Sequence, residues 1–193
     1  MKTLTEHLRD RIQFGFTVAN SVSDKIILFD LDDTIINTTA EITVYRNGKF
    51  LKRISNTEYN DYVPKSGESL GFEDFCNVDI LNKETFTRYW ETLKREYRKG
   101  THIGILTARS DSKMIKRFFL GRGINIKDEL VIAVNDPSLG LSGTIQDRKS
   151  EAIDILANAG YKTFIFFDDN LPNLKAAKEL ENKLDIKVHT VHV

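Results

Sequence analysis

The chain has 193 residues, and its 28 lysines and arginines balance 28 aspartates and glutamates, so the formal charge is zero. This length suits one domain of ordinary size with a sizeable core, and the charge balance excludes an overall basic field that would attract nucleic acid. Cys76 is the only cysteine, which excludes an intramolecular disulfide and a cysteine-rich zinc site. The charged N-terminal residues and the lack of a long apolar run predict a cytoplasmic protein with no membrane partner.

The first predicted elements are a short amphipathic helix and a buried strand. Residues 3–14 carry leucine and isoleucine at four-residue spacing behind a capping box of Thr3 and Glu6, and a lead-in runs to residue 24. Ile26 to Phe29 then form an unbroken apolar run, which is typical of a strand buried on both faces of a sheet. We therefore predict a buried strand over residues 25–30.

This strand ends at three carboxylates in four positions, Asp30, Asp32 and Asp33. Buried unpaired charges are costly, so we expect a wet or metal-filled crevice here, as at the carboxyl ends of strands in open α/β sheets. Asp30 and Asp32 face the same way in an extended chain, and Mg²⁺ would relieve their repulsion, leaving one carboxylate as nucleophile and one to exchange a proton. A calcium loop, which Glu41 fits but Ile35 contradicts, and an inert acidic strand end are the alternatives.

An insertion is predicted over residues 37–81. Residues 41–54 read as a β-hairpin around Asn47-Gly48, the dipeptide that favours a type I′ turn. Residues 55–81 show no clear periodicity, so we expect an irregular segment that forms a flap over the acidic crevice. Its three tyrosines, Tyr45, Tyr59 and Tyr62, would either stack on nucleic-acid bases or pack within the flap.

Helices and strands alternate over the rest of the chain. We predict helices over 83–99, with Asn82 as N-cap, and from residues 111, 148 and 172, and strands over 102–106, 130–134, 163–167 and 186–193. A loop rich in glycine, proline and serine is expected over residues 135–146. The alternation predicts a central parallel sheet with right-handed crossovers.

Four polar features stand in order at the ends of these elements: Asp30-Leu31-Asp32-Asp33-Thr34, then Thr107, then Lys149, then Asp168-Asp169. This series resembles the four motifs of the haloacid dehalogenase (HAD) superfamily of phosphotransferases. The motifs are Asp-x-Asp-x-Thr after a strand, a threonine or serine ending the next strand, a lysine at the start of a helix, and an acidic pair after another strand. The resemblance covers roughly residues 25–193.

The resemblance implies a Mg²⁺-dependent phosphomonoester hydrolase that forms an aspartyl-phosphate intermediate. Asp30 would be the nucleophile, and Asp32 would act first as acid and then as base. Thr107 and the backbone near Ala108 would donate hydrogen bonds to the phosphate. Lys149 would neutralise charge on both the nucleophile and the phosphoryl group.

The resemblance also implies where the metal is bound. Mg²⁺ would lie between Asp30 and the fourth-motif acids, with Asp32 contributing its backbone carbonyl. Either Asp168 or Asp169 would be the direct ligand, and the sequence does not separate them. Arg109 would either grip the substrate phosphate or stabilise its own loop.

The implied fold is α/β, a three-layer sandwich with a central parallel sheet (HAD-like and Rossmannoid), in a single domain over residues 1–193 with a small cap over 37–81. The absence of a large cap favours a bulky substrate, or else closure by the flap or by a second subunit of a homo-oligomer. Asp168-Asp169 and Thr107-Ala108-Arg109 resemble the phosphatase domains of polynucleotide end-processing enzymes. A nucleotide or nucleic-acid end phosphate is therefore the expected substrate, with a protein phosphatase, a small-metabolite phosphatase and an idle binding module as alternatives.

Overall fold

The computed structural model describes residues 24–193, so the predicted helix over residues 3–14 lies outside the described residues. The chain divides into two compact units, which are described separately. The core unit comprises residues 24–36 and 86–193, and the insertion unit comprises Asn37–Thr85. Within residues 24–193, no helix combines the length and the apolar character that crossing a bilayer requires.

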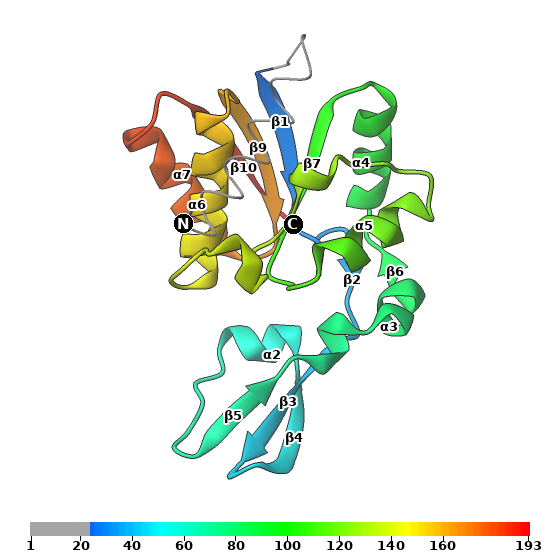
Figure 1. Cartoon of the computed structure of the whole chain (residues 1–193), viewed down its shortest axis with the longest axis vertical. Helices are drawn as coiled ribbons and strands as arrows, with labels where there is room; N and C mark the ends of the chain where they lie inside the picture. Colours follow the sequence, from blue (N-terminus) through cyan, green and yellow to red (C-terminus); the bar gives the residue numbers. More distant parts are fainter. Residues whose placement is uncertain (1–23) are drawn as a thin grey trace. The chain divides into compact units, whose positions relative to one another are not determined.

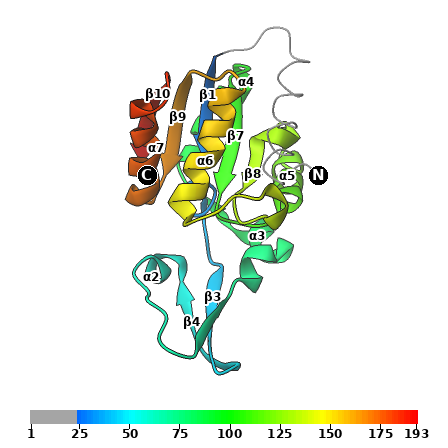
Figure 2. The ribbon, with the colours of Figure 1, turned by 60° about the vertical axis from the view of Figure 1, so that its left-hand side comes forward.

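The core unit is built around a parallel five-stranded sheet in the order β10-β9-β1-β7-β8 (Figure 2). Its strands are β1 (Lys25–Phe29), β7 (His102–Thr107), β8 (Val131–Ala133), β9 (Thr163–Asp168) and β10 (Lys187–His192). The predicted buried strand is confirmed, and β1 lies at the centre of the sheet, because it pairs with β7 on one side and with β9 on the other. Phe29 lies beside Ile105 and Phe167 in this register, and the Phe29 and Phe167 rings stack at 4.7 Å.

Helices flank this sheet on both faces, with α6 and α7 on one side and α4 and α5 on the other (Figure 1). The helices are α4 (Tyr89–Arg98), α5 (Ser112–Leu120), α6 (Ile145–Asn158) and α7 (Leu171–Glu179), with short 3-10 turns η2 (Asp128–Leu130), η3 (Pro137–Leu139) and η4 (Leu180–Asn182). The fully buried side chains of β1 fill the space between the layers. The prediction of an α/β fold with a helix-flanked parallel sheet is confirmed, and the arrangement is Rossmann-like.

The predicted start of the helix over 83–99 is wrong, because α4 begins only at Tyr89. Residues Thr85–Phe86 form a short strand, β6, and the Thr87 N–H and hydroxyl donate to the carbonyls of Ile35 and Thr34. These bonds hold the chain extended where the sequence pattern suggested a first helical turn. Asn82 is not a helix cap, because it lies inside α3 (Val78–Lys83), whose N-cap is Asn77.

The start of α6, the helix that carries Lys149, also differs from the prediction. α6 begins at Ile145 rather than near residue 148, because Thr144 and Asp147 form a capping box there. The predicted loop over 135–146 is therefore shorter, and it contains the turn η3. Lys149 consequently lies in the second turn of α6.

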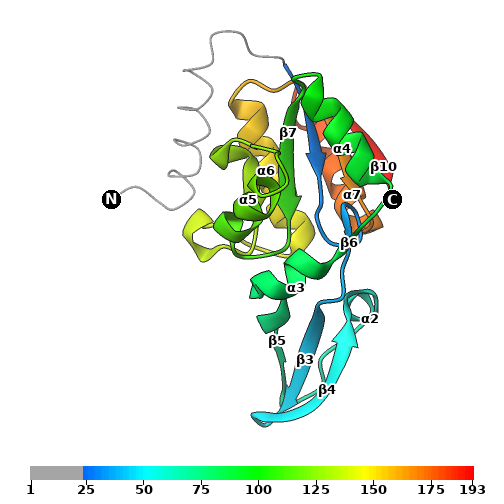
Figure 3. The same ribbon diagram turned by 90° about the vertical axis from the view of Figure 1, so that its right-hand side faces the viewer.

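The insertion unit contains an antiparallel sheet in the order β4-β3-β5 (Figure 3). Strands β3 (Glu41–Arg46) and β4 (Lys49–Ser55) form the predicted hairpin, and Asn47 and Gly48 have the positive φ values, 51° and 75°, of a type I′ turn. The expectation that residues 55–81 are irregular is wrong, since they form β5 (Glu68–Gly71), α2 (Asn56–Asn60), η1 (Glu73–Cys76) and α3.

The insertion unit has a small core of its own. Ile42, Val44 and Ile54 are buried, and Tyr59 and Tyr62 pack against them together with Leu70 and Phe75. This contact favours packing over base stacking for those two tyrosines. The chain leaves and re-enters the core unit through β2 (Ile36–Asn37) and β6, which pair with each other.

Candidate active site

The ends of three neighbouring strands bring the predicted motif residues to one edge of the parallel sheet. Asp30 follows β1, Thr107 is the last residue of β7 and Asp168 is the last residue of β9. The pairing of β1 with β9 continues past the end of β1, because the Asp30 N–H donates to the Phe167 carbonyl at 2.9 Å. This edge is where ligands bind in open parallel sheets.

Three carboxylates gather at this edge. Oxygen atoms of Asp30, Asp168 and Asp169 lie within 4.8 Å of one another. Burial raises the pKa of Asp30 well above its ordinary value, and the neighbouring acids Asp168, Asp169 and Asp32 raise it further, against the opposing effect of Lys149. Burial, followed by the charge of Asp168, raises the pKa of Asp169 from 3.8 to about 6. The three groups therefore repel one another when all are ionised.

Lys149 brings a positive charge into this group from α6. Its side chain is buried, and its Nζ lies 2.7 Å from Asp168 Oδ2 and 3.0 Å from Asp30 Oδ1. Burial lowers the pKa of Lys149, but the charges of Asp30 and Asp168 more than offset this effect, so the pKa is raised overall. The ammonium group is therefore charged and lies between the two carboxylates.

The carboxylate of Asp168 is held by several donors besides Lys149. The Asn170 N–H donates to Oδ1 at 2.8 Å, and Asn173 Nδ2 lies 3.0 and 3.2 Å from the two oxygens. Asn173 is buried in the first turn of α7, and the sequence analysis missed it. Its position five residues after Asp168, behind the Asn170 cap and Pro172, was the available signal.

Asp32 is directed to a different partner. A tight turn follows β1, in which the Ile35 and Ile36 N–H groups both donate to the Leu31 carbonyl and Asp33 takes a φ of 55°. The carboxylate of Asp32 is held there by Arg109, whose Nε lies 2.9 Å from Oδ2 and whose Nη2 lies 2.7 Å from Oδ1. The Asp32 side chain is therefore not part of the group formed by Asp30, Asp168 and Asp169.

Arg109 thus forms a buried ion pair that joins the ends of β1 and β7. It is 2% exposed and Asp32 is 7% exposed. The Arg109 N–H also donates to the Thr107 hydroxyl, at 3.3 Å. This pair agrees with the loop-stabilising alternative for Arg109. Thr107 is itself buried, and Ala108 lies between it and Arg109 at the edge of the sheet.

The donor set of this edge fits a divalent cation. Four carboxylates, Asp30, Asp32, Asp168 and Asp169, and two cationic side chains, Lys149 and Arg109, leave a formal charge of minus two. Asp30 Oδ1 is buried, and it forms an ion pair with Lys149 Nζ at 3.0 Å. Buried carboxylate oxygens are the hard ligands that Mg²⁺ prefers.

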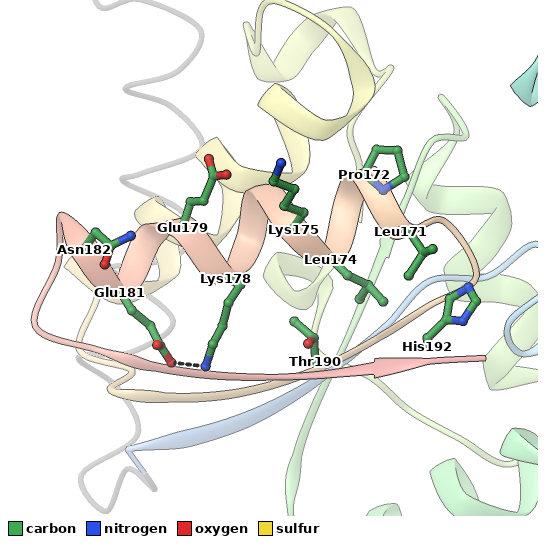
Figure 4. Close-up of a pocket in the computed structure, with 10 residues that line it drawn as sticks. All are labelled: Leu171, Pro172, Leu174, Lys175, Lys178, Glu179, Glu181, Asn182, Thr190 and His192. Carbon is green, nitrogen blue, oxygen red and sulfur yellow. Dashed lines mark hydrogen bonds and ion pairs between the residues drawn. The ribbon is translucent and has the colours of Figure 1, made fainter.

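A separate groove runs along α7 and β10 (Figure 4). Leu171, Pro172 and Leu174 line one end, and the ion pair of Lys178 and Glu181 lies toward the other. None of the predicted site residues lines it. The groove adjoins the site at His192, whose Nε2 donates to the backbone carbonyl of Asp169 at 2.9 Å. This bond anchors the backbone at Asp169 from β10.

Comparison with known protein families finds no family model that matches the chain, and no curated protein or solved structure matches it either. The function of the chain is therefore inferred from the site itself. The structure brings the acids of the first and fourth motifs together with Lys149, and it places Thr107 on the adjacent strand. The carboxylate of Asp32, in contrast, is paired with the guanidinium group of Arg109.

Proposed function

We propose that the chain is a Mg²⁺-dependent phosphomonoester hydrolase of the HAD superfamily that acts through an aspartyl-phosphate on Asp30. The observation that carries this proposal is the group of Asp30, Asp168 and Asp169 within 4.8 Å, with Lys149 in contact with two of them. A nucleophilic carboxylate, a buried cation and oxygen ligands for a metal are the parts that phosphoryl transfer to an aspartate requires.

The residues of the chain would carry out the reaction in two steps. A carboxylate oxygen of Asp30 attacks phosphorus, the bond from phosphorus to the ester oxygen breaks, and Asp32 gives its proton to the leaving alcohol. Asp32 then takes a proton from the water that attacks the aspartyl-phosphate, and the bond from phosphorus to Asp30 breaks to release inorganic phosphate. Lys149 and the Thr107 hydroxyl stabilise the charge that develops on the phosphoryl oxygens.

Mg²⁺ is the proposed metal, and when bound it offsets the negative charges of the carboxylates and the phosphate. Asp169 is a better candidate for a direct ligand than Asp168, because Asp168 already accepts hydrogen bonds from Lys149, Asn170 and Asn173. Asp30 would be a further ligand. The backbone carbonyl of Asp32 remains the ligand that the family resemblance suggests.

The proposed substrate is a phosphate monoester of a nucleotide or of a nucleic-acid end. The similarity of Thr107-Ala108-Arg109 and Asp168-Asp169 to polynucleotide phosphatase domains supports this choice. The insertion unit adds a second support, since Phe50 is 65% exposed on β4 and the exposed lysines Lys49 and Lys52 lie on the same strand. On such a surface an aromatic ring can stack on a base, and the lysines can pair with the phosphates of a nucleic acid.

The test is a comparison of the wild-type chain with Asp30→Asn on 4-nitrophenyl phosphate, with and without EDTA. We expect Asp30→Asn and EDTA each to abolish turnover, and added Mg²⁺ to restore the wild-type rate but not the variant. Asp79→Asn, an exposed acid of α3, is the matched control and keeps the wild-type rate. Turnover by Asp30→Asn at the wild-type rate would exclude Asp30 as the nucleophile. A screen of nucleotides, oligonucleotide 3′ and 5′ ends, phosphopeptides and sugar phosphates then identifies the substrate.

A further inference from the structure

We infer that Arg109 is a positioning residue that changes partners during the proposed reaction. Its guanidinium group holds Asp32 in the free enzyme, and it moves to the phosphoryl group when substrate binds. This inference rests on the proposed function, because a phosphate monoester is the anion that takes the place of Asp32. It adds to that function a mechanism by which substrate binding makes Asp32 available.

The geometry of the pair is that of a closed fork. Nε and Nη2 of Arg109 each donate to a different oxygen of Asp32, at 2.9 and 2.7 Å. The two residues are 77 positions apart in the chain and meet because the ends of β1 and β7 are neighbours in the sheet. Arg109 presents a planar array of donors with no acceptor, so it matches a carboxylate or a phosphate equally well.

The closed fork is incompatible with the role proposed for Asp32. To serve the leaving oxygen and later the attacking water, Asp32 must direct a carboxyl oxygen at the substrate. In the structure both oxygens are instead directed at Arg109. The pair therefore has to open, at least at one of its two hydrogen bonds, before Asp32 can act.

An arriving anion is what can open this pair. Arg109 and Asp32 are both buried, so separating them without a replacement would leave two uncompensated charges away from water. A phosphoryl group offers the guanidinium equivalent acceptors, and the other buried cation of the site, Lys149, is already held between Asp30 and Asp168. Exchange of Arg109 from Asp32 to the phosphate keeps the guanidinium paired. The freed carboxylate of Asp32 takes up a proton from solvent, turns to the substrate and gives that proton to the leaving oxygen.

A double-mutant cycle on the affinity of inorganic phosphate tests the exchange without relying on turnover. Phosphate binding is measured by calorimetry in Mg²⁺ for the wild-type chain, Asp32→Asn, Arg109→Gln and the double variant. We expect Asp32→Asn to tighten phosphate binding by about tenfold, since the guanidinium no longer has to leave a carboxylate, and Arg109→Gln to weaken it by about tenfold. In the Arg109→Gln background, Asp32→Asn should change the affinity by less than about twofold.

Two results would overturn the inference. If Asp32→Asn tightens phosphate binding equally in both backgrounds, the effect is general removal of negative charge and no exchange occurs. If Arg109→Gln leaves the phosphate affinity unchanged, the guanidinium never contacts the phosphate. The ion pair of Lys116 and Asp128, which joins α5 to η2 at 2.6 Å, is the control, and Asp128→Asn and Lys116→Gln should leave phosphate affinity unchanged.

Arg109→Lys keeps the inference falsifiable if Arg109→Gln does not fold. The lysine retains the charge but cannot form the fork, so Asp32→Asn should tighten phosphate binding less in the Arg109→Lys background than in the wild-type background. An equal change in the two backgrounds contradicts the exchange. Failure of the proposed function is recognised separately, because a wild-type chain that hydrolyses monoesters but shows an additive cycle refutes the exchange alone.

Discussion

Replacement of Asp169 by asparagine is expected to stabilise the metal-free chain and to remove a carboxylate from the proposed Mg²⁺ site. The pKa of Asp169 rises from 3.8 to about 6 on folding, chiefly through burial and then through the charge of Asp168. A pKa difference of this size means that ionised Asp169 lowers the free energy of unfolding by about 3 kcal/mol above pH 6. Because Asp169 is only partly buried, screening by solvent reduces the figure to about 1–2 kcal/mol.

The sign of the pH dependence follows from the same pKa. Below about pH 4 Asp169 is protonated in the folded and the unfolded chain, and between about pH 4 and pH 6 it is protonated mainly in the folded chain. Above about pH 6 it is ionised in both states, and the full penalty applies to the folded state. The increase in the free energy of unfolding caused by Asp169→Asn is therefore greatest at pH 8, and it disappears as the pH falls toward 4.

Urea unfolding followed by tryptophan fluorescence measures this difference. Trp90 is the only tryptophan and is buried in α4, so its emission reports on the core unit. In EDTA at pH 8, Asp169→Asn should unfold at higher urea than the wild type, and Mg²⁺ at about 100 times its dissociation constant should add about 2.7 kcal/mol to the wild type and less to the variant.

Asp185→Asn, an acid whose side chain is fully exposed, is the control and should change the free energy of unfolding by no more than about 0.5 kcal/mol. Equal stability of Asp169→Asn and the wild type at pH 8 in EDTA would refute the reasoning. So would a stabilisation of the same size at pH 5 and at pH 8.

Three further substitutions probe the same edge of the sheet. Lys149→Met should lower the free energy of unfolding in EDTA by about 3–5 kcal/mol, because it leaves Asp30 and Asp168 without their buried cation, and urea unfolding at the wild-type midpoint would contradict this. Asn173→Leu should weaken Mg²⁺ binding by about 10- to 100-fold, measured by calorimetry, because Asp168 loses the donor to both of its oxygens, and an unchanged affinity would limit Asn173 to packing. Thr107→Val, which keeps the shape but removes the hydroxyl, should lower kcat on 4-nitrophenyl phosphate by about 100-fold, and it should lower the free energy of unfolding by about 1–3 kcal/mol because the buried Arg109 N–H loses its acceptor; a wild-type kcat would remove Thr107 from the site.

The parts of the fold that depend on continuous local patterns could be predicted from the sequence. The apolar run of Ile26 to Phe29 predicted a buried strand, and Asn47-Gly48 predicted the hairpin turn. The third strand of the insertion unit could not be found in this way. It is short, and its pairing of Leu70 with Val44 joins residues that are distant in the chain.

The same limit applies to the site. The order of the acidic and basic residues along the chain predicted which of them belong together, but not how they pair. The fork between Asp32 and Arg109 depends on the register of β1 and β7, and nothing local to either residue indicates it. Asn173 escaped notice because its role depends on the turn of α7, which returns its amide to the end of β9.

The paired strands β2 and β6 give the insertion unit one entrance and one exit, side by side. Excising Asn37–Thr85 would therefore leave two ends that a short turn can rejoin, with the order of the parallel strands untouched. A segment inserted at such a junction can be replaced by another during evolution. A lineage could thus alter or replace this segment alone, while the carboxylates at the strand ends keep their places.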